Sequence, residues 1–238
     1  MNDYTRLITY LESYGVSVSD DQISQLDKYY EMMIETNKSL NLTAITEFPD
    51  VLVKHYIDSV SIIRDIDMSR DISVIDVGTG AGFPGMVLKI IFPSIKITLF
   101  DSLQKRLTFL DSVISELGLK DINTCHGRAE EAGHLPGMRE QYDLCVSRAV
   151  ANLPVLSELC LPFVKVGGSF VSYKSDKGSE ELASSKHALE VLGGTVSKED
   201  IFTLEDSDMV RNLIIIDKVK NCLKAYPRKP GTPSKKPL

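Results

Sequence analysis

The sequence contains no tryptophan, only four cysteines and no run of about 18 apolar residues. The cysteines, at positions 125, 145, 160 and 222, form no CxxC pair, and no histidine stands near them at metal-ligand spacing. This pattern predicts reduced thiols and argues against a zinc site or any other bound metal. Acidic residues interrupt the apolar positions of residues 1–15, which argues against a signal peptide. We therefore expect a cytoplasmic protein without a membrane partner.

A surplus of positive charge is also lacking, because the net charge is −6, and this argues against a nucleic-acid partner. The distribution of charge points the other way. From Lys218 to Leu238 there are seven Lys or Arg and no Asp or Glu. A basic end on an acidic body indicates a phosphate-rich partner, and a solvated tail is the alternative. We expect the proline-rich residues 221–238 to form an extended arm that contacts RNA phosphates, unless they pack back on the domain.

The length of 238 residues is enough for one large domain with small extensions. Apolar residues at helical spacing predict three helices within residues 1–68, at about 7–11, 19–34 and 49–63. Ser19 suits the N-cap of the second helix, and Pro49 suits the first turn of the third. Residues 1–68 are therefore predicted to be an N-terminal helical extension.

Residues 69–220 alternate short apolar runs with amphipathic segments, which predicts a parallel sheet with helices on both faces. The expected strands are 73–77, 95–100, 122–125, 144–146 and 169–173, and the expected helices are 107–117, 153–164 and 180–192. The last two apolar runs, 195–204 and 212–219, are joined by a short polar link, 205–208, and should form an antiparallel hairpin. Five parallel strands followed by a hairpin define the seven-stranded, Rossmann-like methyltransferase fold of the α/β class.

The strongest chemical signal is the glycine-rich segment that follows the first strand. Gly80, Gly82 and Gly85 satisfy the GxGxxG pattern of dinucleotide-binding loops. Two neighbours oppose that interpretation: Asp76 would present a like charge to a pyrophosphate, and Pro84 lacks an amide that a pyrophosphate would need. A carboxylate here suits a cationic ligand, and S-adenosylmethionine carries a sulfonium and an ammonium group. The segment therefore favours S-adenosylmethionine as the cofactor, with a dinucleotide as the alternative.

Polar residues after the later strands complete the predicted nucleoside site. Asp101 ends the second strand about 20 residues beyond the glycines, where a carboxylate accepts hydrogen bonds from ribose hydroxyls. Its alternative role is to cap a helix before Gln104. The segment 127–130 follows the third strand where the adenine should lie, and 147–151 follows the fourth strand beside the sulfonium end.

Six segments in order resemble one known family over essentially the whole chain, the bacterial 16S ribosomal RNA guanine-N7 methyltransferases, formerly called glucose-inhibited division protein B. The segments are Asn41-Leu42-Thr43, His55-x-x-Asp58-Ser59, Gly78-Thr79-Gly80-Ala81-Gly82-Phe83-Pro84-Gly85, Arg128-Ala129-Glu130, Ser147-Arg148-Ala149 and Tyr226-Pro227-Arg228-Lys229-Pro230-Gly231-Thr232-Pro233. The resemblance implies methylation of N7 of one guanine, at the 527/535 position of the 530 loop, in 16S rRNA or the 30S subunit. We expect the enzyme to act as a monomer.

The resemblance also implies roles for individual residues. The cofactor contacts would be Gly78, Phe83, Ala129, Glu130 and Arg148, in addition to Asp101, and the guanine side would have Asn41, His55 and Arg211. Structural alternatives exist for some of them: a hydrogen-bonded core histidine for His55, an ion pair near Asp76 for Arg148, and core packing for Phe83. Lys105 and Arg106 are expected on a solvated helix face.

The chemistry of guanine N7 agrees with the residues that are absent. N7 has a free lone pair and no proton, so attack on a sulfonium methyl needs alignment but no general base. The sequence accordingly offers no paired-carboxylate or Ser/His/Asp constellation. Two other functions remain open at this point, a small-molecule methyltransferase of the same fold and a non-catalytic RNA-binding scaffold.

Overall fold

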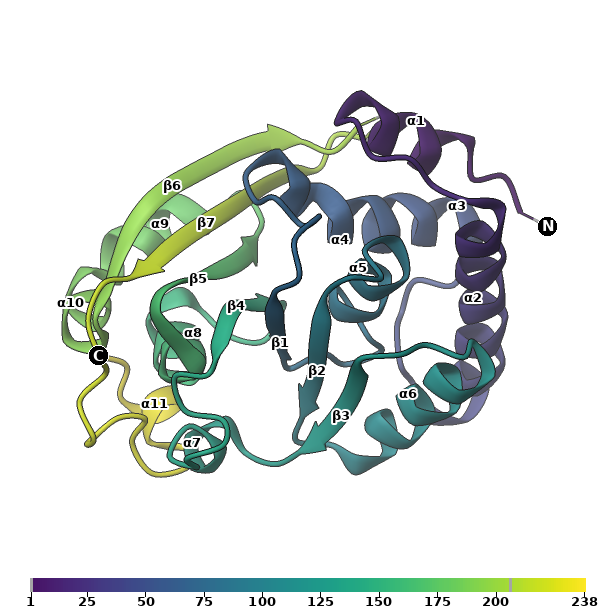
Figure 1. The fold of residues 1–238 in the computed structure, drawn as a ribbon. Coiled ribbons are helices and arrows are strands. Elements are labelled where there is room, and N and C mark those ends of the chain that lie inside the picture. The colour runs from purple at the N-terminus through teal and green to yellow at the C-terminus, as the bar shows by residue number, and fades with distance from the viewer. Residues whose placement is uncertain (1, 206) are drawn as a thin grey trace.

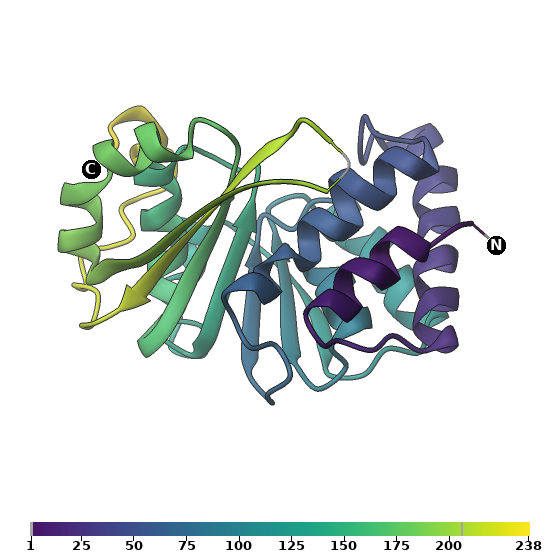
Figure 2. The ribbon, with the colours of Figure 1, turned by 90° about the horizontal axis from the view of Figure 1, so that it is seen from above.

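A computed structural model describes residues 2–205 and 207–238 of the chain. One seven-stranded sheet, ordered β3-β2-β1-β4-β5-β7-β6, lies between two layers of helices (Figures 1 and 2). The strands are β1 (Ser73–Val77), β2 (Lys96–Asp101), β3 (Ile122–His126), β4 (Tyr142–Arg148), β5 (Val164–Lys174), β6 (Gly194–Thr203) and β7 (Val210–Lys218). The first five are parallel, and β7 is antiparallel to β5 and β6. The predicted fold is confirmed; Asp206 of the predicted link lies outside the described residues.

The register brings the carboxyl ends of three strands to one edge of the sheet. Val77 of β1 pairs with Phe100 of β2, and Asp76 pairs with Val146 of β4. The residues from Val74 to Val77 are all buried, as expected for a central parallel strand covered on both faces. The glycine loop after β1, Asp101 at the end of β2 and Arg148 at the end of β4 therefore meet at this edge.

The N-terminal segment forms helices α1 (Thr5–Ser13), α2 (Asp20–Leu40), α3 (Phe48–Val51) and α4 (Asp58–Val60). The predicted helix 49–63 differs from the structure, because α3 and α4 are separated by a π-helical turn, η1 (Leu52–Ile57), and a 3₁₀ turn, η2 (Ser61–Arg64), follows α4. A π-helical turn inserts extra backbone into a helix and is often found at functional sites. Apolar spacing cannot reveal such a turn, since every segment here remains helical.

These helices share one hydrophobic core with the helices on the same face of the sheet, α5 (Gly85–Ile91) and α6 (Gln104–Glu116). Tyr29 of α2 lies at the centre of this core. Its ring contacts Tyr56, Phe83 and Phe109, with centroids 6.1, 5.6 and 6.4 Å away. Its hydroxyl donates a hydrogen bond to the carbonyl of Ala81, at 2.5 Å. The N-terminal extension therefore supports the glycine loop directly.

The other face of the sheet carries α7 (Ala129–Ala132), α8 (Leu153–Cys160), α9 (Gly178–Ser184) and α10 (Lys186–Leu192), with a 3₁₀ turn, η3 (Leu161–Phe163), after α8. The predicted helix 180–192 is in fact two helices that meet at Ser185. The hydroxyls of Ser184 and Ser185 both donate to the carbonyl of Glu181, a pattern that bends helices. No helix in the described part of the chain is long and apolar enough to cross a membrane.

The C-terminal tail packs back on the domain instead of extending into solvent. Figure 1 shows it in yellow beside α7 and α8, ending in a short helix, α11 (Thr232–Lys235). Pro227 and Pro233 are buried, and the guanidinium of Arg228 donates to both carboxylate oxygens of Glu158, which is 1% exposed. The prediction of an extended arm is therefore wrong, and the alternative of a docked tail is correct. Composition could not identify Glu158 as the buried partner.

Candidate active site at the carboxyl edge of the sheet

Two adjoining cavities open at the carboxyl edge of the sheet. The larger, of about 670 Å³, is bordered by η1, the glycine loop and the ends of β4 and β5. The smaller, of about 280 Å³, is bordered by the end of β2 and by α7. They share the lining residues Gly78, Arg106, Ala149 and Val150. A ligand with two chemically different ends could therefore occupy both cavities and cross over Gly78.

Of the seven backbone amides of residues 78–85, six have acceptors within the described protein, and the amide of Ala81 has none. Those of Gly78 and Thr79 donate to the carbonyl of Phe100, and that of Gly80 donates to Asp101, at 2.9 Å. The remaining bonds run from Gly82 and Phe83 to Thr79, from Gly85 to Asp76 and from Met86 to Gly82. A pyrophosphate is held by unpaired amides at a helix start. The single unpaired amide of Ala81 does not make such a cradle, which weakens the case for a dinucleotide.

Asp76 holds this loop together from the end of β1. Its carboxylate is fully buried, and one oxygen accepts hydrogen bonds from the hydroxyl of Thr79, at 2.6 Å, and from the amide of Gly85, at 2.9 Å. Burial raises the pKa of Asp76 to about 6. Asp76 lines neither cavity. Its other oxygen has no hydrogen bond within the described residues, so Asp76 has a structural role in the loop, and its predicted attraction for a cationic ligand stays a prediction.

Gly78 lies where backbone conformation and close approach both require glycine. Its φ is +75°, in the left-handed region, and an added Cβ would lie 2.4 Å from a methyl group of Val150. Val150 belongs to the segment after β4, in which Ala149 also has a left-handed φ of +58°. A side chain at position 78 would therefore displace Val150 and narrow the passage between the cavities.

Asp101 presents a carboxylate to the smaller cavity. One oxygen accepts from the amide of Gly80 and the other from the amide of Leu103, both at 2.9 Å. A carboxylate has about four acceptor sites, so further hydrogen bonds from a ribose diol fit this group. The alternative role of Asp101, as the cap of the helix that begins at Gln104, is not observed in its expected form, because the residue before α6 is Leu103. Arg106, expected on a solvated face, instead lines both cavities and lies 3.7 Å from Asp101.

Ala129 and Glu130 line the smaller cavity from the single turn of α7. Ala129 is buried and Glu130 is half-buried. One carboxylate oxygen of Glu130 accepts a hydrogen bond from the amide of Gly231 in the tail, at 3.0 Å. Both predicted residues thus line the cavity, and Glu130 also contacts the C-terminal tail, which the sequence did not connect to it.

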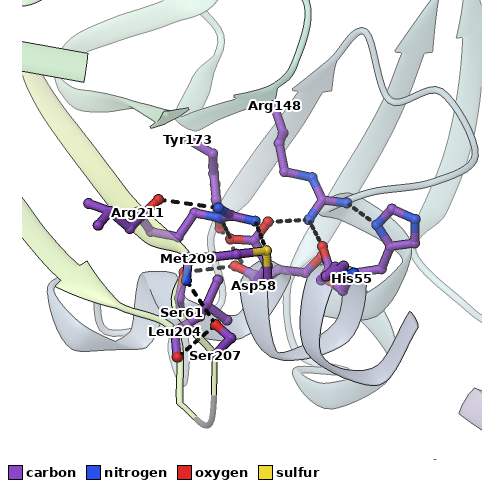
Figure 3. A network of polar contacts seen from close by, with 12 residues as sticks. His55, Asp58, Ser61, Arg148, Tyr173, Leu204, Ser207, Met209 and Arg211 are labelled. Atoms are coloured by element: carbon purple, nitrogen blue, oxygen red, sulfur yellow. Dashed lines mark hydrogen bonds and ion pairs between the residues drawn. The ribbon is translucent and has the colours of Figure 1, made fainter. Parts of the chain in front are cut away.

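Asp58 joins two arginines at the larger cavity, as Figure 3 shows. One carboxylate oxygen accepts from Arg148 of β4 at 2.8 Å, and the other accepts from Arg211 of β7 at 2.9 Å. Asp58 is 3% exposed. The structural alternative for Arg148, an ion pair, is therefore observed, but with Asp58 as the partner instead of a carboxylate near Asp76. Sequence reasoning gave Asp58 no role, although its position three residues after His55 on a helix was an available signal.

His55 is a neutral, fully hydrogen-bonded side chain in this cluster. Its Nδ1 faces Arg148 at 3.2 Å and its Nε2 faces the hydroxyl of Thr43 at 2.9 Å. Because arginine only donates, Nδ1 accepts and the ring proton is assigned to Nε2. Burial and the charge of Arg148 lower the pKa of His55 to about 3. The ring also stacks on Phe83, with centroids 4.3 Å apart, so Phe83 combines core packing with a position on the cavity wall.

Asn41 does not lie in the lining of either cavity. It is exposed at the end of α2 with a left-handed φ of 48°, a conformation that asparagine tolerates well. Its neighbours Leu42 and Thr43 line the larger cavity instead. The side chain of Asn37 bonds both the amide and the carbonyl of Thr43, each at 2.9 Å, and so fixes this loop.

Solved structures of similar fold include a methyltransferase complex and a protein bound to AdoMet. A chain from the complex of the Haloferax volcanii Trm112 methyltransferase activator with a methyltransferase aligns with a TM-score of 0.58 at 14% identity, covering 79% of this chain and 98% of that one. TYW2 from M. jannaschii, in complex with AdoMet, aligns with a TM-score of 0.52 at 12% identity, covering 68% of this chain and 73% of that one. At such identities the likeness establishes the fold.

Sequence comparison is more specific. A protein named ribosomal RNA small subunit methyltransferase G from Alkaliphilus metalliredigens is 52% identical, covering 94% of each chain. One of the same name from Lachnoclostridium phytofermentans is 48% identical, covering 100% of this chain and 98% of the relative. The resemblance predicted from the ordered segments is confirmed. Since the family model described as rRNA small subunit methyltransferase G also matches residues 22–210, the chain belongs to that family of methyltransferases.

Proposed function

We propose that this enzyme transfers a methyl group from S-adenosylmethionine to N7 of one guanine, at the 527/535 position of the 530 loop, in 16S rRNA. The observation that carries the proposal is the pair of adjoining cavities around Gly78. The nucleoside end of the cofactor would lie in the smaller cavity with Asp101 and Glu130, and its methionine end beside Gly78 and Arg148. The guanine would enter the larger cavity near His55 and Arg211.

The proposed reaction requires alignment and no proton transfer from the base. When bound, S-adenosylmethionine supplies an electrophilic methyl group on a sulfonium. Attack by the N7 lone pair forms the N–CH₃ bond and breaks the S–CH₃ bond, so positive charge moves from sulfur to the guanine. His55 suits this chemistry as a neutral side chain that positions its neighbours, because both of its ring nitrogens already have hydrogen-bond partners.

The electrostatics of the larger cavity support a guanine pocket. Arg211 uses its Nε to bind Asp58 and keeps terminal N–H groups near the cavity, where arginine commonly donates to guanine O6. The guanine gains a positive charge on methylation, and an uncompensated second guanidinium group beside Arg211 would oppose that charge. Asp58 offsets one of the two guanidinium charges while holding both side chains in place.

The first experiment separates this function from the two alternatives. The protein is incubated with labelled S-adenosylmethionine and with free nucleosides, naked 16S rRNA, or 30S subunits from a strain that lacks the enzyme. Labelling of rRNA or 30S subunits alone supports the proposal. Labelling of nucleosides would favour a small-molecule methyltransferase, and binding of RNA without any labelling would favour a non-catalytic scaffold.

The second experiment tests the methylated atom. Subunits are reconstituted with 16S rRNA that carries 7-deazaguanosine, in which carbon replaces N7, at the proposed position. We expect labelling to be lost there while unmodified rRNA is labelled, because the carbon has no lone pair to offer. Equal labelling of the two RNAs would contradict the N7 assignment. We propose that the natural partner is the cytoplasmic 30S subunit or its rRNA and that the enzyme acts as a monomer.

A further inference from the structure

The docked tail contacts the proposed cofactor site at one point. The amide of Gly231 donates to one carboxylate oxygen of Glu130 at 3.0 Å. The other oxygen of Glu130 has no hydrogen bond within the described residues, and Glu130 lines the smaller cavity. The hydrogen bond from Gly231 thus fixes the direction of a carboxylate whose second oxygen is available to a ligand.

The anchoring upstream of Gly231 is strong enough to hold this amide in place. Arg228 donates its backbone amide and its guanidinium to Glu158, at distances from 2.6 to 3.1 Å. The carbonyl of Pro227 lies 2.7 Å from Nε2 of His134, and the carbonyl of Tyr226 accepts from Arg139 at 2.8 Å. Prolines on both sides of Gly231 lower the conformational entropy that is lost when the segment docks.

Close packing adds to these hydrogen bonds. An added Cβ at Gly133, directly after α7, would lie 2.9 Å from the ring of Pro227, so the tail and the end of α7 are in contact. Glu130 sits on this single helical turn, which is too short to define its own position without neighbours. The tail therefore packs against the end of α7 through Pro227 and holds the carboxylate of Glu130 through the amide of Gly231.

We infer that the C-terminal tail is a positioning element of the cofactor site, which acts by orienting Glu130 through the amide of Gly231. This inference rests on the proposed position of the nucleoside end in the smaller cavity. It predicts that the tail contributes to S-adenosylmethionine affinity.

The test compares S-adenosylmethionine affinity, by calorimetry, in the wild type and four variants. Ending the chain at Pro230 removes the Gly231 amide but keeps the Arg228–Glu158 pair that anchors the rest of the tail. We expect the Kd to rise about tenfold, since a hydrogen bond to a charged group contributes about that factor. The double variant Lys235→Ala/Lys236→Ala removes two exposed charges and keeps the amide, so its Kd should equal that of the wild type.

Glu130→Ala, alone and combined with the truncation, identifies the route. If the tail acts through Glu130, the truncation should cause no further loss in the Glu130→Ala protein. An unchanged Kd in the truncated protein, or an equal further loss in the combined variant, would overturn the inference. An unchanged Kd in Glu130→Ala would instead overturn the proposed position of the nucleoside end. No RNA is used, so these outcomes are independent of the test for guanine N7.

Discussion

At the scale of single residues, Asp58 positions more of the site than its size suggests, because it holds two arginines of the larger cavity. It binds Arg148 and Arg211, which come from strands that lie far from it in the sequence. Breaking a buried ion pair by removing one partner is strongly destabilising, and here two guanidinium groups would lose their carboxylate. The position of the arginines, and with it the alignment of donor and acceptor, depends on this one side chain.

Asp58→Asn should therefore lower both activity and stability. We expect kcat to fall about 10²-fold, the loss that a misplacement of about 1 Å produces, and the free energy of unfolding to fall by about 3 kcal/mol. Asp200→Asn is the matched control, since Asp200 pairs with Arg64 away from both cavities. That variant should keep its kcat. A normal kcat in Asp58→Asn would contradict the positioning role.

Asp76→Asn tests the buried carboxyl of the glycine loop. Because burial raises the pKa of Asp76 to about 6, the folded protein binds a proton there more readily than the unfolded chain does. The stability that this group contributes is therefore present at low pH and is lost as the pH rises through about 4 to 6. In urea unfolding at several pH values, the free energy of unfolding of Asp76→Asn, relative to that of the wild type, should increase by about 3 kcal/mol between pH 4 and 7.

A carboxyl with the opposite shift provides the control for this pH experiment. The hydrogen bonds and charge of Arg64 lower the pKa of Asp200. The stability that Asp200 contributes is present above the pKa of the unfolded chain and is lost as the pH falls. The free energy of unfolding of Asp200→Asn, relative to that of the wild type, should therefore decrease as the pH rises. The same direction of change in the two variants would be evidence against the raised pKa of Asp76.

The neutral state of His55 predicts a simple pH–rate profile. With the pKa of His55 near 3 and an unprotonated nucleophile, kcat should show no acid limb between about pH 6 and 7 that belongs to histidine. His55→Ala should lower kcat by freeing Arg148 and Thr43 but leave the shape of the profile unchanged. An acid limb that is present in the wild type and absent from His55→Ala would show that the histidine acts as a base.

At the scale of elements, the sequence predicted most strands to within two residues, and it predicted five parallel strands followed by an antiparallel hairpin. Periodicity succeeds there because burial on both faces produces continuous apolar runs. It failed for 49–63, where the π-helical turn η1 changes the pitch without changing the apolar spacing. It also gave no sign that Tyr29 reaches Ala81, since such a contact depends on how α2 packs across the glycine loop.

That contact couples the N-terminal extension to the loop, and Tyr29→Phe tests it. Removing the hydroxyl leaves the carbonyl of Ala81 unpaired, so the free energy of unfolding should fall by about 1–2 kcal/mol and S-adenosylmethionine affinity should also decrease. Tyr56→Phe is the control, because the Tyr56 hydroxyl is equally buried but binds Leu26, away from the loop. Chemical denaturation and calorimetry on both variants give the comparison; equal effects on affinity would contradict a specific link between α2 and the loop.

At the scale of the whole molecule, the basic tail on an acidic body has a different meaning from the one that composition suggested. The sequence correctly indicated a basic end on an acidic body, but it could not show that Arg228 would pair with a buried glutamate on α8. Five of the seven basic residues from Lys218 onward are exposed: Lys220 and, in the docked tail, Lys224, Lys229, Lys235 and Lys236. Docking therefore holds the tail on the domain while leaving these charges accessible to RNA phosphates.

Ending the chain before Tyr226 should then reduce stability more than it changes RNA binding. The truncation leaves Glu158, which is 1% exposed, without its guanidinium, and an uncompensated buried charge costs about 3–5 kcal/mol. Glu158→Gln in the truncated protein removes that charge and should restore part of the lost melting temperature, whereas Glu158→Gln in the full-length chain should be destabilising because it leaves Arg228 without its carboxylate. Glu158→Gln should thus raise the melting temperature of the truncated protein and lower that of the full-length protein. This opposite effect would show that the tail stabilises the fold through the Arg228–Glu158 pair and does not act only by its overall charge. If the melting temperature is unaffected by the truncation and only the salt dependence of RNA binding becomes weaker, the tail works as an arm and its docking contributes nothing to the fold.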